Sequence, residues 1–171
     1  MTERHEGRVR KLGDDINTDY IISSARKKET LDEQILKRFL LESLDPSFAA
    51  TVERGDVLVG GRNFGCGSAM EIAATVILAA GIPIVIAKTF ARSFYRNAIN
   101  NGLVPIECDT DHFSEGDAIS IGFDDFAVVV TNERTAWSET RSALSGIAGA
   151  ILGAGGLVPY LRREGRFVLP R

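Results

Sequence analysis

The segment from Asp56 to Gly81 constrains the fold of this 171-residue chain more than any other. Asp56 to Gly60 reads Asp-Val-Leu-Val-Gly, the pattern of a short buried strand, and a glycine-rich turn follows it. From Ala69 to Ala80 almost every residue is small or apolar, which predicts a helix that is covered on most of its sides. A buried strand that leads through a tight turn into a buried helix is typical of an α/β domain.

The rest of the chain alternates in the same way between strand and helix patterns. The predicted strands cover residues 6–12, 56–60, 82–87, 104–108, 118–123 and 126–131, with Asp124-Asp125 as the tight turn of a hairpin. The predicted helices cover residues 30–44, 69–80, 90–101 and 141–152; residues 26–28 are expected to form a surface loop and residues 162–166 a basic tail. We therefore expect an α/β fold with a mixed sheet and flanking helices, in which residues 1–171 form a single domain.

The composition excludes several classes of function. The chain has 20 Lys and Arg against 23 Asp and Glu, mixed along the sequence, so it lacks the basic patch that binds nucleic acid. Residues 1–10 are polar and no apolar run is long enough to cross a bilayer, so we expect a cytoplasmic protein with no membrane partner. Two cysteines, Cys66 and Cys108, and two histidines cannot supply a four-thiolate cluster site. We expect no metal ligands here, and any iron-sulfur cluster must belong to another chain.

Ser68, which follows the glycine-rich turn, has two interpretations. As a helix N-cap, with Glu71 three residues later, it completes a capping box and stabilises the helix by about 1 kcal/mol. As a reactive group, it is a base or nucleophile on a glycine elbow, near backbone N–H groups that can bind a carboxylate or phosphate. The helix dipole shifts a pKa by at most roughly 1.5 units, so a reactive Ser68 needs a further cation or a metal site.

Gly65-Cys66-Gly67 also has the spacing that opens a dinucleotide-binding fingerprint. The match then fails, because Met70 occupies the position of the third glycine and Lys88 stands where an acidic residue is needed for the ribose. Cys66 lies near the start of the predicted helix, where a thiol can become reactive. With no histidine nearby in the sequence, we expect Cys66 to pack closely or to line a substrate site.

Three motifs follow one another in the first 110 residues. Residues 13–22 read Gly-Asp-Asp-Ile-Asn-Thr-Asp-Tyr-Ile-Ile, and residues 63–68 read Asn-Phe-Gly-Cys-Gly-Ser. Residues 87–103 read Ala-Lys-Thr-Phe-Ala-Arg-Ser-Phe-Tyr-Arg-Asn-Ala-Ile-Asn-Asn-Gly-Leu. In order and spacing, the three motifs resemble the small subunit of 3-isopropylmalate dehydratase and homoaconitase, in the aconitase superfamily.

The resemblance implies a swivelling β/β/α domain that closes over a large subunit holding a [4Fe-4S] cluster. It implies a hydro-lyase that is active only with that large subunit and that removes and re-adds water on a hydroxy di- or tricarboxylate. In the family a cluster iron acts as Lewis acid on the hydroxyl and a serine of the swivelling domain is the base. Ser68 matches that serine. The first expected substrate is 3-isopropylmalate, of leucine biosynthesis.

The chain departs from the family directly after Ser68. Where the family usually reads Gly-Ser-Ser-Arg-Glu-His, residues 67–72 read Gly-Ser-Ala-Met-Glu-Ile, so the substrate-binding arginine is missing. Methionine cannot replace a bidentate arginine. Either another cation binds the carboxylate, with Arg26, Lys27 and Arg62 the nearest candidates, or the substrate differs. The expected substrate-binding residues are Arg26, Lys27, Asn63, Gly65, Cys66, Gly67 and Ala69.

Two alternatives to isopropylmalate chemistry stay open. One is a related hydro-lyase subunit for another hydroxy acid, of the dimethylmalate, citramalate or homoaconitate type. The other is a non-catalytic module in which the glycine elbow binds an anion and the changes at Ala69, Met70 and Ile72 reflect lost catalysis. In isolation the chain is expected to be folded, colourless and inactive, and it could form a homo-oligomer.

Overall fold

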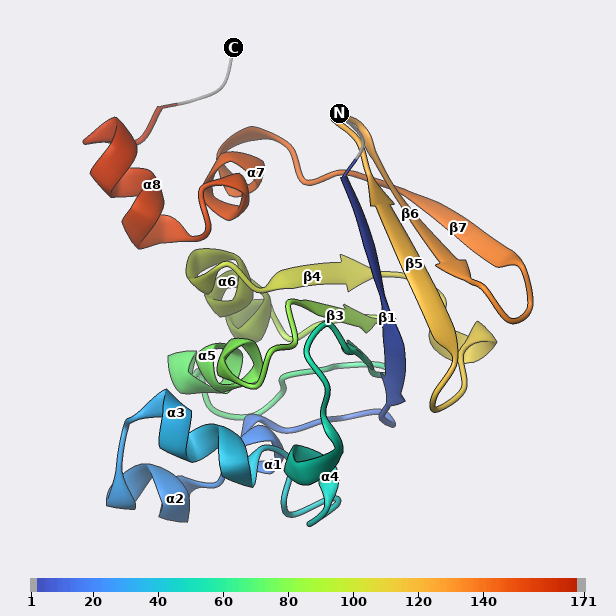
Figure 1. Cartoon of the computed structure of the whole chain (residues 1–171). Coiled ribbons are helices and arrows are strands. Elements are labelled where there is room, and N and C mark those ends of the chain that lie inside the picture. Colours follow the sequence, from blue (N-terminus) through green and yellow to red (C-terminus); the bar gives the residue numbers. More distant parts are fainter. Residues whose placement is uncertain (1–2, 169–171) are drawn as a thin grey trace.

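The computed structural model describes residues 3–168. The strands of this part of the chain form one seven-stranded sheet, and the helices pack around it (Figure 1). Its strands lie in the order β4-β3-β2-β1-β5-β6-β7. They are β1 (Glu3–Lys11), β2 (Val57–Val59), β3 (Ile84–Ala87), β4 (Val104–Glu107), β5 (Ala118–Phe123), β6 (Ala127–Asn132) and β7 (Trp137–Ser142). Neighbours from β1 to β4 pair in parallel, whereas those from β1 through β5 and β6 to β7 pair antiparallel. The expected α/β fold with a mixed sheet is confirmed.

Strand β1 belongs to both parts of the sheet. Its last residues pair with β2, with Val9 opposite Val57, and its first part pairs with β5, with Arg8 opposite Ala118. We call β1 to β4 with their connections the parallel half, and β5 to β7 the antiparallel half. A single strand thus joins the parallel and the antiparallel part of one sheet.

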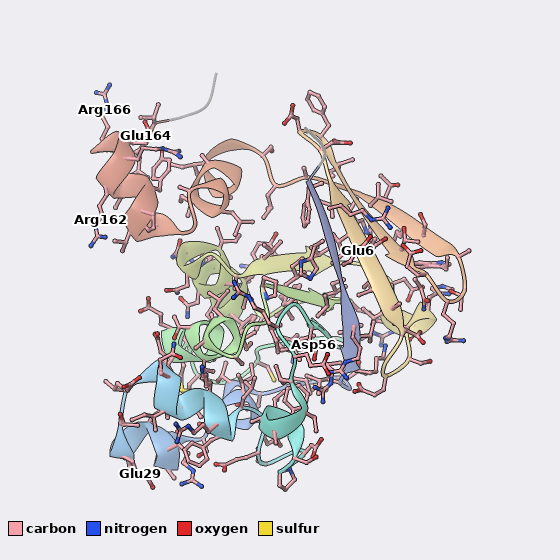
Figure 2. All side chains as sticks on the ribbon, in the orientation of Figure 1. Glu6, Glu29, Asp56, Arg162, Glu164 and Arg166 are labelled. Atoms are coloured by element: carbon pink, nitrogen blue, oxygen red, sulfur yellow. The ribbon has the colours of Figure 1, made fainter. Side chains whose placement is uncertain are left out.

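Asp56 links β1 to β2 through charge. Its carboxylate is buried directly before β2, where it accepts hydrogen bonds from Arg8 at 2.8 Å and from Arg10 at 3.4 Å. Figure 2 shows Asp56 beside β1, inside the molecule. A buried carboxylate needs such partners, because an unpaired buried charge is costly. The ion pairs therefore hold β1 against the start of β2.

The parallel half is buried on both faces. Leu58 and Val85 point into a core that includes Ala74 of α5 (Glu71–Ala79) and Phe94 of α6 (Arg92–Asn101). Because successive side chains of a strand alternate, their neighbours point the other way. There the core contains residues of both halves, among them Val57, Val59, Ile84, Ile86, Ile119, Ile121 and Val130. Burial on both faces explains why these strands read as unbroken apolar runs.

The single long helix expected over residues 30–44 does not form. That segment contains only the short helix α3 (Glu33–Leu36) and the 3₁₀ turn η1 (Lys37–Phe39); α1 (Thr18–Ile21) and α2 (Ser24–Glu29) precede it, and α4 (Phe48–Thr51) follows it. Asp32 caps α3 by accepting a hydrogen bond from Gln34 N–H, so the helix begins three residues after the expected start at residue 30. Leu41 has φ +57° and donates its N–H to Ile21 O, which takes the backbone off the helical path. Leu31, within the segment expected to be helical, is 71% exposed.

The basic stretch 26–28 lies in helix α2, so the expected surface loop was wrong. Ser23 caps this helix, because its side chain accepts a hydrogen bond from Arg26 N–H. No residue of α2 is buried, so the segment carries no apolar periodicity that would mark it as a helix.

The C-terminal part also differs from expectation. Residues 137–142 form β7, which was not predicted and which overlaps the start of the helix expected over residues 141–152; that helix, α7, covers only Gly146–Gly153. Strand β7 is an edge strand with mostly exposed, polar side chains, which hides the strand pattern. Helix α8 (Leu157–Glu164) extends over part of the expected basic tail, and Figure 2 shows its Arg162 and Glu164 directed away from the sheet.

The turn expected at Asp124-Asp125 is confirmed. It joins β5 to β6, and Asp124 Oδ1 accepts the N–H groups of Phe126 at 2.8 Å and Ala127 at 2.7 Å. A further 3₁₀ turn, η2 (Thr110–His112), follows β4. Among the helices of residues 3–168, none combines the length and apolar character of a membrane span.

Candidate active site

The glycine elbow, residues 63–68, lies at the carboxyl end of β2, and the two other sequence motifs hold it from both sides. On one side, Gly65 N–H donates to Ile16 O and Thr18 N–H donates to Cys66 O, each at 2.8 Å. On the other side, Phe64 N–H donates to Thr89 O at 3.0 Å and Ala91 N–H donates to Phe64 O at 2.9 Å. The three motifs therefore meet in one place and fix the elbow through backbone hydrogen bonds.

Close approach explains the glycines of the elbow. Gly65 has φ +78°, and a Cβ there would lie 2.2 Å from Cγ of Phe94. Gly67 has φ +92°, and a Cβ there would lie 2.5 Å from Oδ1 of Asn17. Both positions thus require glycine for conformation and for space. The turn places Ser68 and Ala69 on the surface, where both are exposed.

Ser68 is not the cap of the core helix, so that interpretation was wrong. Helix α5 begins at Glu71, its N-cap residue is Met70, and no side chain of the described residues caps it. The turn at Gly67 and the extended backbone at Met70 (φ −114°, ψ 113°) set Ser68 outside the helix. Ser68 O instead accepts a hydrogen bond from Thr18 Oγ1 at 2.9 Å. The hydroxyl of Ser68 therefore does not accept a capping hydrogen bond from the N-terminus of α5.

Asn63 and the acidic loop 13–19 support the start of the elbow. Asn63 has φ +57°, and its Nδ2 donates to Asp15 Oδ1 at 2.7 Å. Asp14 Oδ1 accepts the N–H of Arg62, also at 2.7 Å. The carboxylates of Asp14 and Asp15 thus hold the turn at residues 62–63, and the side chain of Asn63 serves as a hydrogen-bond donor to Asp15.

Of the three candidate cations, Arg62 is exposed beside the elbow, and Arg26 and Lys27 lie in α2 with different surroundings. Arg26 forms a bidentate pair with Glu42, at 2.9 and 3.2 Å, and its guanidinium lies 3.8 Å from the ring centroid of Phe39. The hydrogen bond to Glu42 raises the pKa of Arg26 above its usual value. Lys27 instead lies beside the segment that follows the elbow, because its Nζ contacts Sδ of Met70. Of the two, Lys27 lies next to the segment that carries Ser68.

The two cysteines lie in different environments. Cys66 is part of the elbow and is half-buried, whereas Cys108 is buried behind the end of β4. Burial, together with the negative charge of Glu139, raises the pKa of Cys108 to about 12, and a protonated thiol is a poor metal ligand. No three His, Cys, Asp or Glu side chains gather as a metal site within residues 3–168. The side chains that the structure describes therefore do not fit an iron-sulfur cluster.

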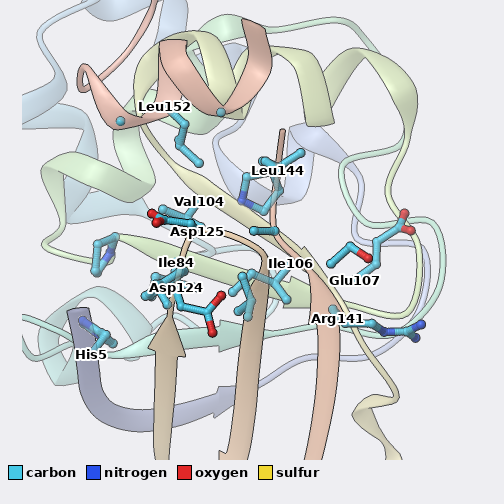
Figure 3. A pocket seen from close by; sticks show the side chains of 18 of the residues that line it. His5, Ile84, Val104, Ile106, Glu107, Asp124, Asp125, Arg141, Leu144 and Leu152 are labelled. Atoms are coloured by element: carbon cyan, nitrogen blue, oxygen red, sulfur yellow. The ribbon is translucent and has the colours of Figure 1, made fainter. Parts of the chain in front are cut away.

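A cavity of about 1000 Å³ lies elsewhere in the molecule (Figure 3). It opens between β4, the β5–β6 turn and α7, and its lining includes Glu107, Asp124, Arg141 and Leu152. The elbow residues do not contribute to this lining. The cavity and the elbow are thus separate features.

Sequence patterns alone missed two contributors to the site. Thr18 holds Ser68 O and is itself buried, and Asn17 fills the space that Gly67 leaves open. Both lie in the first motif, but only the tertiary structure brings them to the elbow. Position 70 was singled out for the loss of an arginine, yet its contact with Lys27 could not be read from a separation of 43 residues.

Comparison with known proteins places this geometry in a family. The family model of the aconitase C-terminal domain matches residues 17–111, which include all of the elbow and most of the residues that hold it. The chain is 45% identical over 160 residues to the methanogen homoaconitase small subunit of Methanocaldococcus jannaschii, covering 93% of this chain and 92% of that protein. It is 44% identical to the 3-isopropylmalate dehydratase small subunit of Nitratidesulfovibrio vulgaris, with 93% and 95% covered.

A solved structure agrees. The crystal structure of 3-isopropylmalate dehydratase (LeuD) from Methanocaldococcus jannaschii superposes with a TM-score of 0.88 at 40% identity, covering 95% of this chain and 96% of that one. Identity at this level over nearly the whole length extends the match beyond the motifs to the antiparallel half and the C-terminal helices. The chain therefore belongs to the aconitase C-terminal domain family, in the group that contains the small subunits of 3-isopropylmalate dehydratase and homoaconitase.

Proposed function

We propose that this chain is the small subunit of a heteromeric hydro-lyase that dehydrates and rehydrates a hydroxy dicarboxylate, with 3-isopropylmalate as the first candidate. The observation that carries the proposal is Ser68, which is exposed on an elbow held by backbone hydrogen bonds and does not serve as a helix cap. The names of the relatives at 44% and 45% identity support the same class of reaction. The proposed compartment is the cytoplasm.

In this proposal Ser68 Oγ is the base. It removes a proton from the carbon next to the hydroxyl-bearing carbon, and the electron pair of that C–H bond becomes the second bond of an alkene. The substrate loses H⁺ and OH⁻, together one water, so the step is redox-neutral; rehydration is the reverse. The exposed residues 67–69 are suited to a small anionic substrate. Asn63, Cys66, Gly67 and Ala69 shape this surface, and the buried Gly65 contributes by allowing the turn behind it.

Ser68 needs help that this chain does not supply alone. A helix dipole stabilises a nearby anion by at most about 2 kcal/mol, and this effect falls off within the first turn. Ser68 lies two residues before the N-cap of α5, so the dipole contributes less still. We propose that a large subunit completes the site and holds the [4Fe-4S] cluster, which supplies a Lewis acid for the substrate hydroxyl when bound. The isolated chain is then expected to be inactive.

The test is reconstitution. The chain is mixed with a cluster-bearing large subunit from the same organism, and the cluster is rebuilt anaerobically. The alkene absorbance is then followed, as it appears from 3-isopropylmalate, citramalate and dimethylmalate and as it disappears on hydration of homoaconitate. Turnover of one of these acids by the mixture, and by neither subunit alone, is the expected result. If a loaded complex turns over none of them, the chain is instead the non-catalytic anion-binding module.

Homoaconitate is the second candidate substrate. The relative named methanogen homoaconitase small subunit is 45% identical to this chain, as similar as the isopropylmalate dehydratase subunits. The ratio of kcat/KM between the two acids decides between them.

A further inference from the structure

The two outer strands of the sheet, β4 and β7, have free edges of different kinds. In β4, Val104 donates its N–H to Pro83 O on the side of β3, so the next residue, Pro105, faces the free edge. Proline has no N–H, and at such a position it protects an edge from pairing with another strand. Strand β7 contains neither proline nor lysine. Its edge therefore lacks the protection that β4 has.

The register of β7 shows which of its backbone groups face this edge. Ala143, directly after β7, donates its N–H to Phe126 O at 2.9 Å. Bonded positions alternate along an antiparallel pair, so the odd-numbered residues of β7 bond to β6. The N–H and C=O groups of Ser138, Thr140 and Ser142 therefore point away from β6. These three residues are exposed, and Figure 1 shows β7 as the outermost strand on its side of the molecule.

The sequence of this edge is complementary to itself. Residues 138–142 read Ser-Glu-Thr-Arg-Ser, with Thr140 at the centre and a serine at each end. If two copies pair antiparallel about a twofold axis at Thr140, Glu139 of each copy lies opposite Arg141 of the other, which is a stabilising cross-strand pair. An axis one residue earlier places Glu139 opposite Glu139, and an axis one residue later places Arg141 opposite Arg141. Like charges in these positions are destabilising, so the charges favour a single register.

The two charged side chains are already held at the edge within one chain. They lie on the same face of β7, and Arg141 Nε is 2.8 Å from Glu139 Oε1. The other carboxylate oxygen, Glu139 Oε2, accepts the N–H of Asp109 at 2.8 Å. A second copy would add its own Glu139 and Arg141 to this pair and complete a ring of alternating charges. Because the side chains are ordered beforehand, pairing costs less conformational entropy.

We propose that two copies of this chain associate through antiparallel pairing of their β7 strands about Thr140, which joins their sheets into one. The interface is isologous, as is usual for a twofold dimer. In the strand order, β1, β5 and β6 separate β7 from β2, which leads into the elbow, so pairing at β7 leaves the elbow open. One pair of strands forms a small interface, so the dimer is expected to be reversible and dependent on concentration. The proposal uses this chain alone and is independent of the proposed function.

The first test is sedimentation velocity of the full chain over a series of concentrations, with thermal unfolding to show that each variant is folded. Thr140→Pro removes an outward N–H and keeps the bonds to β6, and Arg141→Glu places like charges across the axis. Each is expected to raise the dimer Kd roughly 10-fold or more. The control Arg163→Glu makes the same change of charge at an exposed position of α8 and should leave Kd unchanged. A wild-type chain that stays monomeric, or an equal effect of Arg163→Glu, overturns the proposal.

A charge exchange tests whether the ion pairs act across the axis. The double variant Glu139→Arg with Arg141→Glu restores opposite charges across the twofold axis in the same register. Its dimer Kd is expected to return to within a few-fold of the wild-type value. A double variant that dimerises as weakly as Arg141→Glu would contradict the pairing of these residues between copies.

Cross-linking tests the register directly. In Thr140→Cys the two new thiols lie at the axis, with Cα atoms about 5.5 Å apart, which is within the range of a disulfide. In Ser138→Cys they are offset by four residues along the strands, or about 14 Å apart. Mild air oxidation followed by a non-reducing gel is expected to give a covalent dimer for Thr140→Cys and none for Ser138→Cys or for wild type, which retains Cys66 and Cys108. Equal cross-linking of the two variants, or none of Thr140→Cys, would refute pairing about Thr140.

Discussion

The parallel and the antiparallel half use glycine for different purposes. In the parallel half, Gly65 and Gly67 stand where a Cβ would collide with Phe94 and Asn17. In the antiparallel half, Gly122 of β5 and Gly116 of the turn before it have nothing within 4 Å of a Cβ. The glycines of the elbow are therefore needed for close packing, and those of the second half are not.

The difference shows where this fold places function. The loops of the parallel half meet at the carboxyl edge of the strands and interlock, which is the usual place for a site in such sheets. The strands of the antiparallel half are joined by short turns. The family model likewise matches residues 17–111 and ends before β5. We expect substitutions in the first half to affect chemistry, and comparable ones in the second half to affect stability or nothing.

The largest expected effect is on catalysis by Ser68→Ala. If Ser68 is the base, kcat of the reconstituted complex falls roughly 100-fold or more, the usual scale of general acid–base contributions. Because Ser68 is exposed and caps no helix, the free energy of unfolding is expected to change by less than about 0.5 kcal/mol. Ser138→Ala, at an exposed position of β7, is the matched control and should change neither quantity. A Ser68→Ala complex with normal kcat would remove Ser68 from the mechanism.

Gly65→Ala tests the packing difference directly. The added methyl group meets Phe94 and the backbone is held at φ +78°, so overpacking and strain together are expected to cost about 2–4 kcal/mol of unfolding free energy. The control Gly122→Ala adds the same methyl group in open space and is expected to stay within about 0.5 kcal/mol. Urea unfolding of the two variants measures both. Equal destabilisation would mean that the two halves do not differ as argued.

Thr18→Val tests whether the parallel half supports the position of Ser68 through the hydrogen bond from Thr18. It removes the hydroxyl that holds Ser68 O while keeping the shape of a buried side chain. Losing one hydrogen bond and leaving its acceptor unpaired is expected to cost about 1–2 kcal/mol. We expect kcat to fall severalfold, because Ser68 loses a fixed support. Thr18→Ser keeps the hydroxyl and should recover most of the rate; an equal loss in both variants would point to packing instead.

The smallest effect is confined to acid pH and belongs to the antiparallel half. Hydrogen bonds from Arg134 at 2.6 Å, aided by Ser114 N–H and Asn132, lower the pKa of Asp117 to about 2 from a usual 3.8. A carboxyl whose pKa is lower in the folded state stabilises the fold above about pH 4, and this contribution is lost as the pH falls toward 2.

Asp117→Asn should therefore flatten the pH dependence of unfolding between pH 4 and 2, and leave kcat at neutral pH unchanged. Thermal unfolding at several pH values measures the first and the reconstituted complex the second. The same acid dependence in variant and wild type would show that Asp117 does not carry it.

The elements that sequence analysis located well are those with a strong periodic signal. The strands of the parallel half and helices α5 and α6 lie close to where the apolar pattern predicted them. The strands are buried on both faces and each helix buries one side, so each has a clear apolar pattern. Helix α2 and strand β7 were missed, because neither buries a side chain and so neither has a pattern to read. For residues 30–44 the prediction of one helix was wrong although a pattern is present. The apolar residues have helical spacing, but the backbone leaves the helical conformation at Leu41.

The sequence by itself determined the family, the α/β class and the glycine elbow with Ser68, since these depend on local residue types and on motif order. Only the tertiary structure decided the role of each side chain at the elbow. It showed that the N-cap residue of α5 is Met70 and not Ser68, that Arg26 is held by Glu42, and that Lys27 contacts Met70. The last two are contacts between residues 16 and 43 positions apart, which no local pattern specifies. They arise because burying the apolar strands and helices brings three distant loops to one edge of the sheet.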